Sequence, residues 1–493
     1  MVSERYDIET DVIVIGCGAA GAASAISAQD NGADVLILEK MPQIGGNTAV
    51  AGGNMVIPRE PEKFAEYMKK VCFGTAEPEI IDTFVQELVK NPDWLKKMEG
   101  GELRKFVFPP ATYSLNIPDV TFPGIPGAEN VDLWCVKESE ITSAPTGGAR
   151  LLQVLSREVE RMGIKVMTST PAKELIQNEK GEIIGVVAES EGKDIAIKAK
   201  RGVIMTCGGF ENDDALKWDN LVPKPLCFYG SLGNTGDGIR MTQKVGAMMW
   251  HMDAQSTKYG FKPPEFPAAF AIEFTSPGFI YVDKHGRRFV GEGEVELHLW
   301  WEPLSVFDYD RFEYPRVPFY AIFDEEAKRT APICFGLSGY NVVMENYKWS
   351  TDNSTEIKKG WIIKAKNIHE LAKRLSMDER ILENTITKYN EFCRAGKDAD
   401  FSRSRASLKV IDSSPLYAIE LRPTIINTQG GPRRDKEARI LDPYNKPIPR
   451  LYSAGEFGSI WGFRYQTSTN LSECLVFGRI AGRNAATSSP VES

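Results

Sequence analysis

The chain has 493 residues, enough to form two or more structural domains with large cores. Its composition, 42% hydrophobic and 26% charged, excludes bulk disorder. Because 59 Lys and Arg stand against 67 Asp and Glu, with no long basic run, the net charge of −8 gives no electrostatic basis for binding nucleic acid or an anionic membrane.

The first forty residues predict a β-α-β unit. An apolar strand over 11–15 leads through a glycine-rich turn into a helix of small residues over 22–31, and a second strand follows over 33–39. Apolar runs typical of buried strands recur further along the chain, at 164–168, 182–189, 202–206 and 450–454. The fold class is therefore predicted to be α/β.

The turn of this unit carries a nucleotide-binding motif. Gly16, Gly18 and Gly21 fit G-x-G-x-x-G, in which the glycines allow a tight turn, the approach of backbone N–H groups to a pyrophosphate, and close packing of helix on strand. Glu39 ends the second strand, where it can accept hydrogen bonds from ribose hydroxyls. The motif predicts a dinucleotide but does not distinguish FAD from NAD.

Two further segments favour FAD. Residues 45–53 are rich in glycine and have too little side chain to pack a core, so we expect their backbone to lie against a large planar group. Near the C-terminus, Asn470 and Glu473 have the spacing of a capping box at the start of the last helix. The N–H groups of that helix end could donate to the anionic edge of a reduced flavin.

The middle of the chain has a different texture, with many aromatic residues, proline-rich loops and charged helices predicted over 368–375 and 379–392. We interpret 251–413 as an inserted α+β domain that caps the substrate. Residues 1–250 and 414–493 are then the two parts of a discontinuous Rossmann-like domain.

Several features argue against other classes of protein. The eight cysteines are scattered and form no C-x-x-C pair, so we expect no metal site and reduced thiols, as in a cytoplasmic protein. The apolar run at 12–28 is preceded by acidic residues and interrupted by glycine. We therefore expect neither a signal peptide nor a membrane span.

Over nearly its whole length the chain resembles the flavoprotein superfamily of soluble fumarate reductases, succinate dehydrogenase flavoprotein subunits and 3-ketosteroid dehydrogenases. The resemblance rests on collinear segments: GCGAAG, LILEK, IGGNTAVAGGN, GGARLLQVL, VIMTCGGF, GNTGDGI, GRRFVGE, INTQGG, LYSAGE and NLSECLVFGRIAGRNAA. It implies FAD as the cofactor. Respiratory members attach the flavin covalently through a His in the loop that corresponds to 45–53, which contains no His here, so noncovalent FAD is expected.

The resemblance also implies which residues bind the cofactor. They form the pyrophosphate turn, the ribose acceptor, the loop beside the isoalloxazine, the adenine contact, the contacts to the central chain and the donors at the pyrimidine edge. In chain order these are Gly16, Gly18, Ala19, Ala20, Gly21, Glu39, Lys40, Gly45, Gly46, Asn47, Thr48, Gly52, Gly53, Ala172, Gly208, Gly209, Asp237, Glu456, Asn470 and Leu471.

The superfamily moves a hydride between the flavin and a carbon β to a carbonyl or carboxylate, while an acid or base handles the proton on the neighbouring carbon. Fumarate reductases bind their dicarboxylate with an Arg and two His. Those positions correspond here to Glu296 and to residues near Asn427 and Tyr259, so a dicarboxylate is not favoured. Tyr465 resembles the Tyr with which ketosteroid dehydrogenases bind a ketone oxygen, protonate it or abstract a proton. Arg464 beside it could clamp a carboxylate or enolate, or pair with a surface acid.

Residues 292–298 alternate like a strand, with Glu296 and His298 among four residues predicted on one side. If that side faces the cleft, Glu296 could be the general base, with His298 as the next choice. If it faces water, neither has a role.

The aromatic residues of the inserted domain, taken together, suggest an apolar, ring-bearing substrate, although each one alone is more typical of a core. They are Trp250, Tyr259, Phe261, Trp300, Trp301, Tyr309, Tyr314, Phe319 and Tyr320, joined by Trp461 and Phe463.

We therefore interpret the chain as an FAD-dependent oxidoreductase that desaturates, or in reverse reduces, a C–C bond next to the carbonyl of a hydrophobic, cyclic ketone. Two alternatives stay open: a fumarate-like reductase of α,β-unsaturated carboxylates, and a non-catalytic flavin protein of electron transfer. The expected partners are a small hydrophobic carbonyl compound and an unidentified electron donor or acceptor. The candidate catalytic residues are Tyr465, Glu296, Arg464, Tyr259 and His298.

Overall fold

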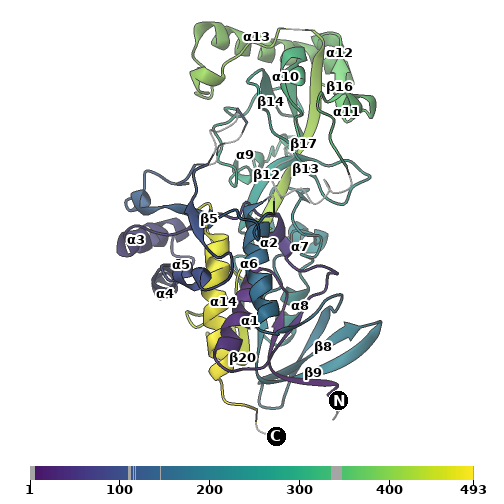
Figure 1. Cartoon of the computed structure of the whole chain (residues 1–493). Helices are drawn as coiled ribbons and strands as arrows, with labels where there is room; N and C mark the ends of the chain where they lie inside the picture. Colours follow the sequence, from purple (N-terminus) through teal and green to yellow (C-terminus); the bar gives the residue numbers. More distant parts are fainter. Residues whose placement is uncertain are drawn as a thin grey trace.

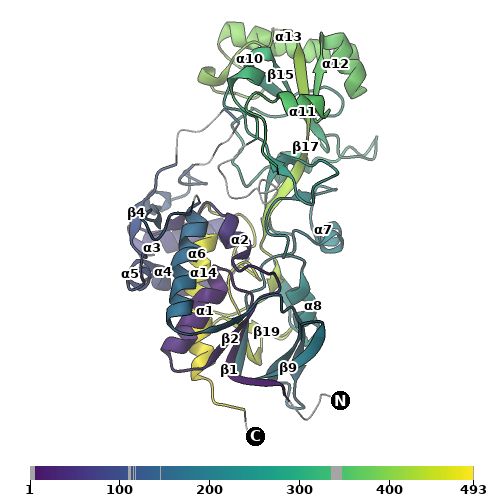
Figure 2. The same cartoon turned by 45° about the vertical axis from the view of Figure 1, so that its right-hand side comes forward.

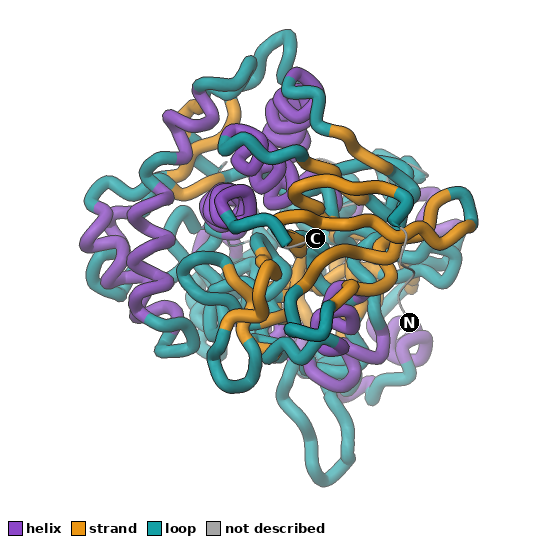
Figure 3. Tube along the Cα trace, turned by 90° about the horizontal axis from the view of Figure 1, so that it is seen from below, coloured by secondary structure: helices purple, strands orange, loops and turns teal. Residues whose placement is uncertain are grey.

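The computed structural model describes residues 6–108, 113–114, 116, 118–144, 146–334, 347–412 and 414–491. The chain forms two lobes stacked along one axis (Figure 1). The lower lobe contains the largest sheet, and the upper lobe is the cap. Both ends of the chain lie at the end of the lower lobe that is far from the cap (Figures 1 and 3).

The predicted β-α-β unit is present in the lower lobe. β1 (Ile8–Ile15) and β2 (Val35–Leu38) pair in parallel, and α1 (Ala19–Asp30) connects them. All four residues of β2 and the last four of β1 are buried. This is the burial expected of parallel strands whose two faces are both covered.

The remaining strands of the lower sheet bring distant parts of the chain together. The order β19-β20-β9-β1-β2-β6, with β8 on β9 and β7 on β8, places β20 from the C-terminal part in parallel beside β9. The strands predicted at 164–168, 182–189, 202–206 and 450–454 are confirmed as β6, β8, the end of β9, and β20. The bounds are β6 (Lys165–Met167), β7 (Ala172–Gln177), β8 (Ile183–Ser190), β9 (Lys193–Met205), β19 (Arg439–Leu441) and β20 (Pro447–Ser453).

Three helices, α1, α6 (Gly147–Arg161) and α14 (Asn470–Thr487), lie beside one another in the lower lobe (Figure 2). Small residues let α1 and α14 approach closely: a Cβ on Gly482 would lie 2.2 Å from the carbonyl oxygen of Ser24. Within the described ranges, no helix has the length and apolar character needed to cross a bilayer.

Beside these helices lies a smaller group of elements that includes a three-stranded sheet. It contains α3 (Pro61–Cys72), α4 (Pro78–Leu88), α5 (Asn91–Lys96), β3 (Met55–Val56), β4 (Leu103–Lys105) and β5 (Leu133–Val136). Three short helices complete the lower lobe: α2 (Gly46–Val50), α7 (Asp214–Asn220) and α8 (Asp237–Lys244).

The cap is built on a second sheet, of order β13-β12-β17-β15-β14, with β10 and β16 also paired to β17. The two predicted helices are confirmed as α12 (Ile368–Leu375) and α13 (Glu379–Ala395). The other elements are β10 (Cys227–Phe228), β12 (Gln255–Phe261), β13 (Phe270–Ala271), β14 (Phe279–Val282), α9 (Trp301–Leu304), β15 (Phe319–Asp324), α10 (Glu325–Thr330), α11 (Ser354–Lys358), β16 (Ile362–Ala365) and β17 (Leu416–Thr428).

Two of the connections between the lobes lie close together. β11 (Met249–Trp250) pairs with β18 (Gly431–Pro432), and the long strand β17 runs from the cap down to the lower lobe (Figures 1 and 2). Residue 413, the predicted end of the inserted domain, lies outside the described residues. Because β17 pairs with cap strands along its length, we propose that the capping domain extends to Thr428.

The strand predicted at 292–298 is wrong, because this segment forms turns. The carboxylate of Glu292 turns into the cap interior and binds Arg288 at 2.6 Å, whereas Glu296 and His298 bind each other at 2.8 Å. The charged side chains of the segment therefore do not share one face. The alternation in the sequence reflects two separate buried contacts, one between Glu292 and Arg288 and one between Glu296 and His298.

Candidate active site

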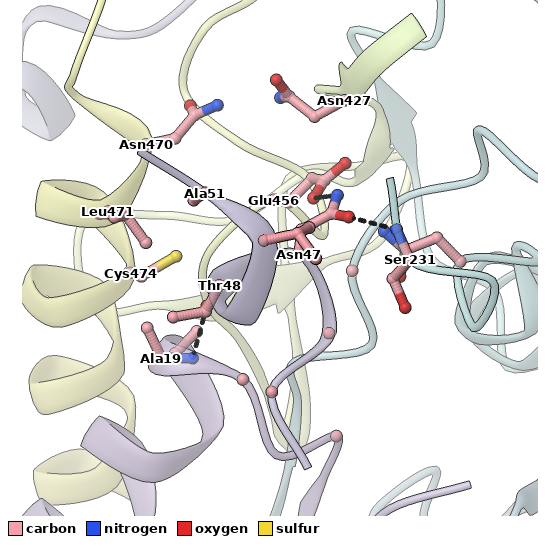
Figure 4. Close-up of a pocket in the computed structure, with 18 of the residues that line it drawn as sticks. Ala19, Asn47, Thr48, Ala51, Ser231, Asn427, Glu456, Asn470, Leu471 and Cys474 are labelled. Atoms are coloured by element: carbon pink, nitrogen blue, oxygen red, sulfur yellow. Dashed lines mark hydrogen bonds between the residues drawn. The ribbon is translucent and has the colours of Figure 1, made fainter. Parts of the chain in front are cut away.

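A cavity of about 410 Å³ lies where several distant parts of the chain meet. Its volume is within the range of small-molecule and cofactor sites, ~300–1,000 Å³. The walls come from the turn between β1 and α1, the segment around α2, the start of α14 and residues at the lower edge of the cap. Figure 4 shows Ala19, Thr48 and Leu471 converging on it from the first three of these segments, together with Ser231 and Glu456 from other parts of the chain.

All the predicted cofactor residues except Gly21 and Gly209 line this cavity. Both exceptions have packing roles. A Cβ on Gly21 would lie 2.0 Å from the carbonyl oxygen of Gly16, so this glycine lets α1 pack on its own turn. A Cβ on Gly209 would lie 2.4 Å from a carboxylate oxygen of Glu456, so Gly209 leaves room for that side chain. The contacts of the lining residues with a bound cofactor stay predictions.

The glycine-rich turn presents the start of α1 to the cavity. Gly18 is the N-cap, and the first helical N–H, of Ala19, is held by Thr48 Oγ1 at 3.0 Å. The N–H groups of a first turn have no partner inside their helix, and they attract anions. Gly16 adopts φ +98°, and a Cβ there would lie 2.4 Å from the carbonyl oxygen of Thr206.

The carboxylate of Glu39 is fixed at the end of β2. One oxygen accepts from the backbone N–H of Cys17 and the other from that of Met41, each at 2.9 Å. Each oxygen keeps lone pairs for a second donor, as a pair of ribose hydroxyls would require. The neighbouring Lys40 pairs with Asp237 at 2.6 Å.

The segment 45–53 has a second role besides lining the cavity. It contains α2, and its far end packs against the backbone at the start of α6: a Cβ on Gly53 would lie 1.9 Å from the carbonyl carbon of Gly147. Gly53, at φ +85°, is therefore required for this helix contact as well as for any flat surface toward a ligand.

Two carboxyls, that of the buried Glu211 and that of the half-buried Glu456, share a donor at the cavity wall. The Asn47 amide donates to Glu211 at 2.6 Å and to Glu456 at 3.0 Å, and its oxygen accepts from Ser231 N–H at 2.7 Å (Figure 4). Asn234 also donates to Glu211 at 2.6 Å. Burial raises the pKa of both carboxyls, and the charge of Glu211 raises the pKa of Glu456 further. Sequence reasoning missed Glu211, which stands in no motif.

This pair predicts a loss of stability as the pH rises. The pKa of each carboxyl is raised above the ~4.3 of an unfolded Glu, so above that pH the native state binds more protons than the unfolded state. The contribution of this carboxyl pair to the free energy of unfolding is greatest at low pH. As the pH rises toward the native pKa, that contribution falls by up to about 1.4 kcal/mol per pH unit for each excess proton. Glu211→Gln should flatten this fall. Unfolding by denaturant at a series of pH values, with FAD saturating, measures it. The free energy of unfolding could instead fall equally steeply with pH in wild type, in Glu211→Gln and in the exposed control Glu160→Gln. That result would contradict the raised pKa of the Glu211 carboxyl.

The predicted capping box at the start of α14 is wrong. Thr469 is the N-cap, and the Glu473 carboxylate turns inward to bind the buried Arg434 guanidinium and Ser459 Oγ, the latter at 2.7 Å. Asn470 is left facing the cavity. Its side-chain oxygen, like that of Asn54, is buried and has no hydrogen-bond partner among the residues that the structure describes. Both oxygens can accept from a ligand donor such as the N3–H of an isoalloxazine, so the residues present fit FAD.

The part of the cavity toward the cap contains two of the five candidate catalytic residues. His298 and Tyr465 both line it, with ring centroids 5.1 Å apart in an edge-to-face arrangement. Glu296 does not line it but binds His298 from behind. Sequence reasoning missed Phe106 and Phe108, which line the cavity from outside the inserted domain.

Tyr259 and Arg464 are not brought into the cavity. Tyr259 is fully buried in the cap; its hydroxyl donates to the Ser114 carbonyl at 3.1 Å and accepts from Tyr281 at 2.6 Å. Arg464 pairs with Glu302 at 2.7 Å and its guanidinium lies over the rings of Phe463 and Trp301. The sequence suggested that Arg464 either clamps a substrate or pairs with an acidic residue, and the structure shows the pairing.

The expectation that the aromatic residues of the inserted domain, with Trp461 and Phe463, face the substrate is wrong. None of these eleven residues is among the described residues that line the cavity. Trp300 and Phe319 stack in parallel at 6.0 Å and enclose Tyr259 in the core of the cap. The aromatic side chains of this domain pack against one another and stabilise its sheet and loops, which is the commoner role of buried aromatic rings.

Comparisons with known proteins agree with the fold. A family model described as an FAD binding domain matches residues 11–471. The chain is 27% identical to urocanate reductase of Eggerthella lenta, covering 98% of this chain and 75% of that protein. It is 26% identical to a fumarate reductase (cytochrome) of Shewanella frigidimarina, covering 97% and 77%. Among solved structures, 3-ketosteroid delta1-dehydrogenase from Sterolibacterium denitrificans matches with a TM-score of 0.80 at 21% identity, covering 97% of this chain and 99% of that one.

Proposed function

Because the chain belongs to the FAD binding domain family, we propose that it adds hydrogen to, or removes it from, the C–C bond next to the carbonyl of an uncharged, mainly apolar substrate such as a cyclic ketone. Family membership confirms the predicted cofactor, FAD, and the predicted class, an oxidoreductase. When bound, FAD supplies the hydride chemistry. Binding the substrate, excluding water and moving the proton fall to the protein.

The observation that carries this proposal is the character of the cavity wall. Phe106, Phe108 and Leu297 add apolar side chains to it, and the Tyr465 hydroxyl beside His298 can donate to a carbonyl oxygen. Among the described lining residues, the one Lys or Arg is Lys40, which belongs to the group around Glu39 and is already paired with Asp237. A dicarboxylate would leave its charges without cations in this wall, at a cost of several kcal/mol.

The fumarate-like alternative receives less support from the same geometry. It relied on Arg464 as a substrate clamp, and that guanidinium is held by Glu302 outside the cavity. A Glu stands at position 296, where a dicarboxylate would need a cation, and the Glu296 carboxylate would repel a second carboxylate. The relatives include proteins named for fumarate and for steroids, so their names do not choose between the substrates.

The test is the oxidation of the reduced protein by candidate substrates. The holoprotein is reduced anaerobically with dithionite and mixed in a stopped-flow instrument with a cyclic enone or with fumarate, while flavin absorbance is followed. We expect the enone to restore the oxidised spectrum at least ~100-fold faster than fumarate, which corresponds to the cost of an unpaired charge of about 2.7 kcal/mol. Faster oxidation by fumarate would favour a carboxylate reductase. No oxidation by either compound would favour a non-catalytic flavin protein.

A further inference from the structure

Three side chains form a connected polar group on the cap side of the cavity: Glu296, His298 and Thr467. One oxygen of Glu296 accepts from His298 Nδ1 at 2.8 Å and from Thr467 Oγ1 at 3.0 Å. The other oxygen accepts from the backbone N–H of His298 at 2.7 Å. All three partners can donate, as an ionised carboxylate requires. Each of these residues is at most 8% exposed.

The contacts of Glu296 decide which nitrogen of His298 is available for chemistry. Because Nδ1 points at a carboxylate oxygen, Nδ1 carries the proton of the neutral ring, and Nε2 has the lone pair. No described residue makes a hydrogen bond to Nε2. His298 lines the cavity and Glu296 does not. The carboxylate is thus placed behind the imidazole, with the imidazole between it and any ligand.

A second side chain fixes the surroundings of this imidazole. The ring of Tyr465 packs edge to face against it, at a centroid distance of 5.1 Å and an angle of 74°. Both rings belong to the same cavity wall, and the Tyr465 hydroxyl lies 3.4 Å from the backbone N–H of Asn470 at the start of α14. One hydrogen-bonding hydroxyl and one imidazole therefore face the same space from different directions.

We propose that His298 is the acid–base catalyst of the reaction and that Glu296 is the residue that positions it. This inference rests on the proposed function. In desaturation, Nε2 takes the proton from the carbon next to the carbonyl while the β carbon gives up a hydride to FAD, and the electron pair of the broken α C–H bond forms the double bond. In reduction, the imidazolium returns that proton to the same carbon. Tyr465 holds the carbonyl oxygen in both directions.

The same contacts argue against Glu296 as the group that reacts. Both of its oxygens are occupied by the donors described above, and the imidazole separates it from the cavity. A carboxylate in that place fixes the tautomer of the imidazole and stabilises the charge that the ring gains when it takes a proton. The order of the two sequence candidates, Glu296 first and His298 second, is therefore reversed in this proposal.

The experiment compares two His–Glu pairs in the same chain. His298→Gln and Glu296→Gln change the cavity pair. His285→Gln and Glu313→Gln change a surface pair with the same kind of contact, at 2.7 Å, that does not line the cavity. Each holoprotein is reduced and then oxidised by the cyclic enone under anaerobic conditions. Bound FAD per chain and the half-saturating enone concentration are measured alongside.

We expect His298→Gln to slow oxidation by ~10²–10⁴-fold and Glu296→Gln to slow it by at least ~10-fold. Bound FAD should stay the same, the half-saturating concentration should change less than ~3-fold, and both surface variants should match wild type. Free imidazole should restore part of the rate of His298→Ala, which a structural role would not explain. Nitrogen-15 NMR is practical because the chain has only four His. It should show Nδ1–H for the neutral His298 ring in wild type and a mixture of tautomers in Glu296→Gln, with or without FAD.

The outcomes separate this inference from the function on which it rests. If wild type is oxidised by the enone and His298→Gln keeps a rate within threefold of it, the acid–base assignment is overturned. A neutral His298 that carries its proton on Nε2 would overturn the role of Glu296. If wild type does not react with any enone, the proposed function fails and the catalytic role fails with it. If His298→Gln loses FAD, its rate cannot be compared with wild type. The oxidation rate of Glu296→Gln and the tautomer of His298 then decide whether the proposed roles of the two residues hold.

Discussion

A methyl group at Gly18 is expected to remove most of the bound FAD while leaving the protein folded. Gly18 lines the cavity at the start of α1, where the backbone must come close to a pyrophosphate. Its φ of −88° is open to any residue, and a Cβ there would lie 3.4 Å from the Gly45 carbonyl oxygen and 3.5 Å from Thr48 Oγ1. These are ordinary contact distances, so the protein accommodates Gly18→Ala and only the ligand meets the methyl.

Gly16 provides the contrast. Its φ is +98°, and a Cβ would lie 2.4 Å from the Thr206 carbonyl oxygen. Gly16→Ala should therefore destabilise the FAD-free protein, because strained backbone and a clash between main-chain atoms affect the fold itself. The two variants of one motif are thus expected to have different defects: Gly18→Ala loses FAD affinity, and Gly16→Ala loses stability.

FAD affinity and FAD-free stability distinguish these effects. We expect the dissociation constant of FAD to rise roughly 100-fold or more in Gly18→Ala, about 2.7 kcal/mol, with the unfolding midpoint of the FAD-free protein unchanged. Gly124→Ala is the control, because no atom of the described part of the chain lies within 4 Å of a Cβ at that position. Wild-type affinity in Gly18→Ala would show that the phosphates do not approach this turn.

Removing the charge of Glu473 should strongly destabilise the lower lobe. Arg434 is fully buried, and its guanidinium binds the Glu473 carboxylate and lies over the ring of Phe477 at 4.6 Å. Glu473→Gln leaves that cation without a counter-charge. Breaking one partner of a buried ion pair costs about 3–5 kcal/mol, whereas replacing both partners by apolar residues is often nearly neutral.

Denaturant unfolding with FAD saturating measures this effect. The double variant Arg434→Met with Glu473→Leu should recover most of the lost stability. Glu79→Gln breaks an exposed pair with Lys436 and should cost less than about 1 kcal/mol. A cost for Glu473→Gln no greater than that of Glu79→Gln would mean that the buried pair contributes little.

The sequence was sufficient for the nucleotide-binding framework because each of its elements has a local cause. Two apolar runs on either side of a run of small residues identified β1, α1 and β2. Glycines occupy the turn because a phosphate must come close to its backbone. The α12 helix carries its own N-cap, with the Asn367 side chain accepting from the Glu370 N–H at 2.9 Å. Signals of this kind lie within a few residues and do not depend on the rest of the fold.

The cap wall could not be predicted in the same way, because its contacts join residues far apart in the chain. Tyr259 looks as suitable for a substrate wall as Phe106, and only the packing of Trp300 and Phe319 around Tyr259 places it in the core. The capping box failed for a related reason: Arg434, 39 positions before Glu473, binds that carboxylate in place of the helix end. Buried charges choose distant partners that no local pattern records.

The most direct test of the account is a crystal structure of the holoprotein with a cyclic enone bound. We expect noncovalent FAD along the turn at Gly18, the carbonyl oxygen of the enone within hydrogen-bond distance of Tyr465, and Nε2 of His298 facing the carbon next to that carbonyl. An enone bound with its carbonyl away from Tyr465, or an isoalloxazine ring remote from His298, would contradict the proposed site.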